Sequence, residues 1–95
     1  MPVPKLTDRE IEQRLAHLPD WQLQDGKLWR KFKFKNFVES FSFMTSVALL
    51  AEKYDHHPEW LNVYDRVEIW LITHVANGIS ERDFNLATRI NALLI

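Results

Sequence analysis

The spacing of hydrophobic positions changes several times along the chain, and each change predicts a new element. A first apolar series has spacings of four and three residues, which is typical of a short amphipathic helix: Ile11, Leu15 and Leu18. Thr7 followed by Glu10 predicts a capping box at its start, and Pro19 predicts its end. Residues 1–6 hold two prolines and are expected to form a loose tail.

Two pairs of segments alternate apolar and polar residues and predict β-hairpins. They are residues 21–24 with 27–34, and residues 60–64 with 67–75. Asp25-Gly26 joins the first pair and is the strongest short hairpin signal, because glycine readily takes a positive φ. Asp65-Arg66 joins the second pair, and His74 is expected near the end of the last strand.

Two further helices follow the hairpins. Asn36 with Glu39 predicts the start of a central helix that ends before Pro58. Its predicted core stripe is Phe37, Phe41, Met44, Val47, Ala48 and Ala51. Ser80 with Asp83 predicts the start of the last helix, whose apolar stripe is Phe84, Ala87, Ile90 and Leu94. The resulting order α-β-β-α-β-β-α predicts an α+β fold, an antiparallel sheet with helices on one face.

Composition narrows the possible functions. A length of 95 residues predicts a single domain over residues 1–95. With no cysteine, neither a disulfide nor a thiolate nucleophile is available, and a net charge of -1 argues against binding to nucleic acid. No apolar run is long enough to cross a bilayer and no secretory signal is recognisable, so a cytoplasmic protein is expected. Abundant aromatic residues in so short a chain favour a homodimer or homotetramer.

Histidines are the main candidates for chemistry. His56 and His57 lie at a helix-to-strand junction, and a hairpin would bring His74 towards them. Histidine both donates and accepts protons near neutral pH, so the three residues suit acid–base catalysis. Surface or helix-capping roles explain the same residues about as well, and His17 is expected on the surface.

Other readings of the polar and aromatic residues also stay open. Three histidines can hold zinc, although no established zinc-binding spacing is present. Asp83 is expected to cap its helix and could also orient a histidine or bind a substrate. Glu52 and Asp55 are solvated helix charges by default and partners of the histidines if the site is real. Packing roles are expected for three aromatic residues, one of which could instead stack on a flat heterocycle: Trp21, Trp60 and Tyr64.

One combination of residues and spacings is specific enough to indicate a protein family. Two segments carry it, AEKYDHHPEWLNVY and THVANGISERDFNLA, in which the marking residues are Glu52, His56, His57, Pro58, Tyr64, His74 and Asp83. This pattern closely resembles the signature of the pterin-4a-carbinolamine dehydratases, and the similarity extends over residues 21–95. The resemblance implies a four-stranded antiparallel sheet with helices on one side.

The resemblance also implies an activity. Enzymes of this family dehydrate 4a-hydroxytetrahydropterin to quinonoid dihydropterin, which recycles the pterin cofactor of aromatic amino-acid hydroxylases, and they use no metal or organic cofactor. Carried onto this sequence, the three catalytic histidines of the family are His56, His57 and His74. Our hypothesis is that His57 is the principal acid–base residue, while His56 and His74 position the hydroxyl and exchange protons. Asp83 matches the acid of the pattern and is expected among the catalytic residues. The implied pterin contacts are Asp55, His56, His57, Ile72, Thr73, His74 and Val75.

Two positions depart from the family pattern. Val75 stands where some relatives carry an acid, which could alter the pterin contacts. Trp70 replaces a smaller strand residue and could change how the open face of the sheet assembles. Some family members also act as dimerisation partners of a transcription factor, so a protein-binding module or transcriptional coactivator is the alternative function.

Overall fold

The computed structural model describes residues 3–94 and confirms the predicted order of helices and strands. The elements in chain order are α1 (Asp8–Leu15), β1 (Gln22–Gln24), β2 (Lys27–Lys33), α2 (Phe37–Tyr54), β3 (Glu59–Val63), β4 (Arg66–Leu71), the short 3₁₀ helix η1 (His74–Ala76) and α3 (Glu81–Ala92). Within residues 3–94, no helix combines the length and the apolar character that crossing a membrane requires.

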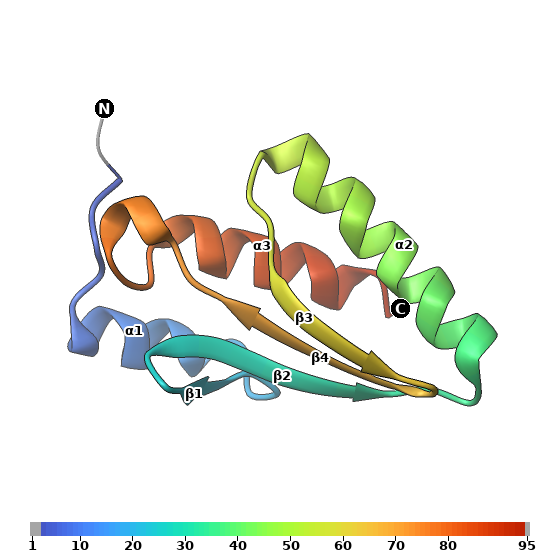
Figure 1. The fold of residues 1–95 in the computed structure, drawn as a ribbon. Helices are drawn as coiled ribbons and strands as arrows, with labels where there is room; N and C mark the ends of the chain where they lie inside the picture. The colour runs from blue at the N-terminus through green and yellow to red at the C-terminus, as the bar shows by residue number, and fades with distance from the viewer. Residues whose placement is uncertain (1–2, 95) are drawn as a thin grey trace.

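All four strands form one antiparallel sheet in the order β1-β2-β4-β3, with the helices on one face (Figure 1). The centre of the sheet is the pairing of β2 with β4, in which Leu28 lies opposite Leu71 and Phe32 opposite Val67. Because side chains alternate between the two faces of a strand, these four residues point to the same side and are buried beneath the helices. This arrangement confirms the predicted α+β fold.

The predicted caps are present and explain where the helices begin. The Thr7 N–H donates to Glu10 Oε1 at 2.9 Å, and the Glu10 N–H donates to Thr7 Oγ1 at 3.2 Å. The hydrogen bond from the Thr7 backbone to the Glu10 carboxylate is the main cause that lowers the pKa of Glu10, and the Thr7 side chain lowers it further. Asn36 caps α2 through the Glu39 N–H, and the Asp25-Gly26 turn has positive φ at both residues, as its hairpin requires.

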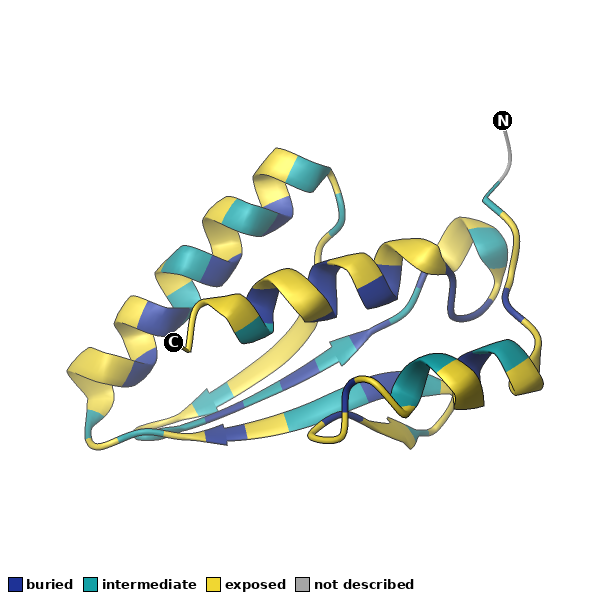
Figure 2. Cartoon of the chain, turned by 180° about the vertical axis from the view of Figure 1, so that it is seen from behind, coloured by how far each residue is buried: buried dark blue, intermediate teal, exposed yellow. Residues whose placement is uncertain are grey.

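The predicted stripe of α2 is wrong at several positions. Phe37, Phe41 and Ala48 are exposed, whereas the buried positions are Ser40, Phe43, Val47 and Ala51. Figure 2 shows the exposed colour along the outer side of α2. The helical period was therefore right, but α2 carries apolar residues on more than one side and turns a different side to the sheet.

Four smaller expectations also need correction. The strand predicted over residues 67–75 ends at Leu71, because the chain then folds into η1, and the Thr73 N–H donates to the Gly78 carbonyl at 3.0 Å. The turn before it is Tyr64-Asp65, since Arg66 already pairs with Val63. Leu6 belongs to the core and not to a loose tail; residues 1 and 2 of that tail lie outside the described residues. Of the three aromatics expected to pack, Trp21 is buried, whereas Trp60 and Tyr64 are exposed.

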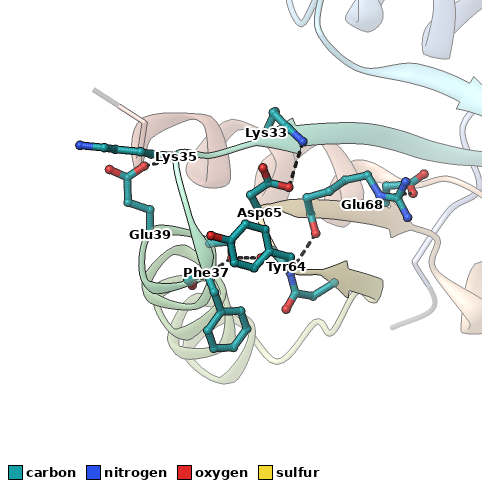
Figure 3. A network of polar contacts seen from close by, with 10 residues as sticks. Lys33, Lys35, Phe37, Glu39, Tyr64, Asp65 and Glu68 are labelled. Atoms are coloured by element: carbon teal, nitrogen blue, oxygen red, sulfur yellow. Dashed lines mark hydrogen bonds and ion pairs between the residues drawn. The ribbon is translucent and has the colours of Figure 1, made fainter.

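Polar contacts hold the start of α2 against the turn between β3 and β4 (Figure 3). Lys33 Nζ donates to Asp65 Oδ1 at 2.9 Å, and the Ser40 hydroxyl contacts the Tyr64 carbonyl. The Lys35 N–H donates to Glu39 Oε1 at 2.9 Å. Of these contacts, the one from Ser40 joins the start of α2 to the turn, and the one from Lys33 joins the end of β2 to it. The two adjacent histidines lie beyond the other end of this 18-residue helix, before β3.

Candidate active site

The His56-His57 pair follows a sharp change of chain direction at the end of α2. Asp55 has φ 50° and ψ 46°, the left-handed conformation that commonly ends a helix. The His56 N–H still donates to the Ala51 carbonyl at 3.1 Å, so its backbone is tied to the last turn. Pro58 follows, and β3 begins at Glu59. The pair is thus held between two regular elements at the predicted junction.

His56 is paired with a fully buried carboxylate. Its Nε2 lies 2.6 Å from Asp83 Oδ1, and the two side chains are 10% and 0% exposed. Asp83 is at the third position of α3, where its Oδ2 also accepts the Ser80 N–H at 2.9 Å and completes the predicted capping box. Asp83 therefore caps α3 and contacts a histidine at once, as the sequence left open.

His57 has a different environment. Its Nε2 lies 2.6 Å from Glu52 Oε1, and its side chain is 57% exposed. Glu52 projects from the last turn of α2, five positions before His57, and is itself exposed. A proton on His57 can consequently exchange with a ligand or with solvent, because both members of the pair are exposed.

His74 lies at the start of η1, and its Nε2 is 3.7 Å from Glu59 Oε2. Glu59 also accepts a hydrogen bond from Lys27 Nζ at 2.7 Å, which links β2, β3 and η1. The His74 side chain is 78% exposed. Sequence reasoning missed Glu59, and only its place directly after Pro58, at the first pair of the second hairpin, could have pointed to it.

The remaining predicted contact residues lie at different depths. Thr73 is buried, and its hydroxyl donates to Asp83 Oδ2 at 2.8 Å, so Thr73 and Asp83 are brought together with His56. Asp55 and Val75 are exposed. Ile72 is half-buried and lines a separate hollow of about 290 Å³ with Lys5 and Asn77, among others.

Two other expectations concern histidines and metals. His17 is exposed just beyond α1, as predicted. Among residues 3–94, no group of three or more histidine, aspartate or glutamate side chains lies in a position to hold one metal ion. The zinc alternative therefore gains no support from the geometry of the described residues.

The geometry defines a class of protein: a small α+β protein with three histidine–carboxylate pairs around the ends of α2 and β4, an arrangement suited to moving protons. The family model described as pterin 4 alpha carbinolamine dehydratase matches residues 4–93. The chain belongs to this family.

Relatives agree with this assignment over nearly the whole chain. A protein of Chelativorans sp. (strain BNC1), named "Putative pterin-4-alpha-carbinolamine dehydratase", is 51% identical and aligned over 93% of this chain and 92% of its own length. A protein of the same name from Prochlorococcus marinus (strain MIT 9313) is 53% identical over the same shares. Among solved structures, the crystal structure titled transcriptional coactivator/pterin dehydratase from Brucella melitensis is similar to this chain, with a TM-score of 0.90 and 47% sequence identity. The match covers 94% of this chain and 97% of the Brucella chain.

Proposed function

We propose that this protein dehydrates 4a-hydroxytetrahydropterin to quinonoid dihydropterin and water by histidine acid–base catalysis. The observation that carries the proposal is that each of three neighbouring histidines has its own carboxylate partner. Family membership supports the pterin as the substrate. A pterin regenerated in this way would serve aromatic amino-acid hydroxylases.

The reaction needs one proton donated to the 4a-hydroxyl oxygen and one proton removed from N5. The bond from C4a to the hydroxyl oxygen breaks after this oxygen is protonated, because water leaves far more easily than hydroxide. The electron pair on N5 forms the new double bond to C4a, and the proton on N5 is then removed. An acid and a base on the enzyme accomplish this without net consumption of protons.

The three histidine environments suggest how these steps are divided. We assign His57 the principal exchange of protons, because it is exposed and its partner Glu52 is exposed too. His56, fixed by buried Asp83, would position the hydroxyl and pass on protons. His74 would act from η1, with Glu59 beside it. Asp55 and residues 72–75 would contact the pterin through their backbone groups.

A direct assay tests the activity. The carbinolamine is generated freshly by a hydroxylase reaction, and its conversion to the quinonoid product is followed with and without the protein. We expect clear acceleration over the spontaneous dehydration, with no change after treatment with a chelator. A rate equal to the spontaneous one would contradict the proposed function.

A protein-binding role is the second candidate, because α2 and β3 present exposed apolar residues and the Brucella relative is titled a transcriptional coactivator as well as a pterin dehydratase. Such a role would make this chain a dimerisation module for another protein. Binding of that kind should survive replacement of the histidines, whereas dehydration should not.

We further propose that the protein is a homodimer or homotetramer that buries the outer side of α2. Val38, Phe41 and Leu49 are exposed on α2, and Thr45 lies between them in sequence. Spacings of three and four residues place these four side chains in one stripe, which can pack against the same stripe of a second copy. Beside this stripe, Trp60 closes a small apolar hollow of about 180 Å³ together with Phe41.

Sedimentation tests this assembly. We expect the unmodified protein to sediment above the monomer mass, and Phe41→Asp to shift it towards monomer because each contact would bury a charge. Leu23→Asp is the matched control, since Leu23 is equally exposed but lies on β1, and it should leave the mass unchanged. A purely monomeric unmodified protein would contradict the proposal.

A further inference from the structure

A buried chain of hydrogen bonds runs from the start of α3 to His56. Arg82 N–H donates to Ser80 Oγ at 3.2 Å, Ser80 Oγ lies 2.6 Å from Thr73 Oγ1, and Thr73 Oγ1 donates to Asp83 Oδ2 at 2.8 Å. Asp83 Oδ1 then lies 2.6 Å from His56 Nε2. Ser80, Thr73 and Asp83 are at most 2% exposed, so little solvent competes for these groups.

The direction of every proton in this chain follows from counting donors. Asp83 Oδ2 accepts from two donors, the Ser80 N–H and the Thr73 hydroxyl. Thr73 has a single hydroxyl proton and donates it to Asp83, so Ser80 must be the donor in its hydrogen bond with Thr73. Ser80 in turn accepts from the Arg82 N–H. All the protons therefore point towards Asp83.

This order also decides which nitrogen of His56 carries a proton. A carboxylate oxygen only accepts, so the His56 Nε2 facing it must be an N–H donor. In the described part of the polypeptide, Arg66 Nε is the one buried side-chain nitrogen or oxygen without a hydrogen-bond partner. His56 Nδ1 also has no hydrogen-bond partner among the described residues, but it is not one of these buried atoms. It therefore keeps some exposed surface, which leaves it able to meet a ligand.

We propose that Thr73 and Ser80 are positioning residues that orient Asp83 and so hold His56 as the Nε2–H tautomer, with Nδ1 as the nitrogen that faces the substrate. The effect on turnover rests on the proposed function, whereas the tautomer does not. Family resemblance assigned Thr73 only a contact with the pterin; here its side chain is already committed to Asp83. Both residues act through Asp83 and need not touch the substrate.

Nitrogen-15 NMR of the histidine rings tests the proposal. Two-bond proton–nitrogen spectra distinguish a protonated ring nitrogen from an unprotonated one, and His56→Gln identifies the His56 signals. At alkaline pH, where the ring is neutral, we expect Nε2 protonated and Nδ1 unprotonated. In Thr73→Val, which removes only the hydroxyl, we expect a mixture of tautomers and a kcat lowered about tenfold, the equivalent of one hydrogen bond to a charged group. Thr73→Ser should restore both.

Controls keep the outcomes separate. Thr88→Val is the matched control, since among residues 3–94 the Thr88 hydroxyl bonds only to the Phe84 carbonyl within α3, and it should leave the His56 signals and kcat unchanged. If Thr73→Val fails to fold, Ser80→Ala tests the same effect on the His56 tautomer, because Ser80 donates to Thr73 in this series of hydrogen bonds. An Nδ1–H tautomer in the unmodified protein, or His56 signals unaltered in the variant tested, overturns the proposal. A fixed Nε2–H tautomer in a protein without dehydratase activity would support the positioning network and contradict the proposed function alone.

Discussion

Replacing His57 by alanine should lower kcat for the dehydration by about 10²- to 10⁴-fold, the range that general acid–base catalysis contributes. This corresponds to about 3 to 5 kcal/mol of transition-state stabilisation. The loss should not come from unfolding, because the His57–Glu52 pair is exposed and such pairs contribute at most about 1 kcal/mol. Denaturation in urea, run beside the kinetic assay, checks both parts.

A control and a rescue sharpen this experiment. His17→Ala removes an exposed histidine far along the sequence from the site and should leave turnover unchanged. Free imidazole should restore part of the activity of His57→Ala, because the vacated position is open to solvent. Unchanged turnover in His57→Ala would rule out His57 as the principal acid–base residue.

Local rules predicted most of the fold because each element carries its own signal. The caps at Thr7, Asn36 and Ser80 lie where their side chains predicted, since a hydroxyl or amide satisfies the free N–H groups at a helix start. Alternation along β4 puts Val67, Ile69 and Leu71 on one face of the sheet, and all three are buried. These signals depend on residues close together in the sequence.

The sequence did not predict which side of α2 packs on the sheet or where β4 ends, because contacts between elements decide both. Apolar residues surround more than half of α2, so only packing decides that Phe43 faces the sheet and Phe41 does not. The last strand was predicted too long because the alternation continues to Thr73, whereas residues 74–76 form η1. Asn77, with φ 56°, ends η1 and lets the chain turn back so that Thr73 pairs with Gly78. Asn tolerates this left-handed conformation, but no short-range pattern requires it there.

The candidate site shows the same difference between what neighbouring residues predict and what only tertiary contacts decide. Spacing along the sequence selected the histidines and Asp83 as candidate site residues, because those residues carry the family signature. It could not identify Glu59 as the neighbour of His74, or Ser80 as a partner of Thr73, since both contacts join segments that come together only in the folded chain. Of the three histidine partners, only Glu52 and Asp83 belong to the signature.

Asp83→Asn should have the largest effect on stability. The amide keeps the shape of the side chain, but it offers one accepting oxygen where the carboxylate receives the donors of His56, Thr73 and Ser80. Its NH₂ group must face at least one other donor in a site that is 0% exposed. We expect the free energy of unfolding to fall by about 3 kcal/mol, the range for breaking a buried charged contact.

The same variant should also lose activity, because an amide NH₂ facing His56 favours the opposite tautomer, as in other sites where a carboxylate orients a histidine. Urea denaturation and the dehydratase assay, performed at a temperature where the variant is folded, separate the two losses. Glu81→Gln is the matched control: Glu81 starts the same helix but forms an exposed pair with Arg14, so it should cost less than about 1 kcal/mol. Full turnover in folded Asp83→Asn would restrict Asp83 to capping α3 and would leave His56 without a need for its carboxylate.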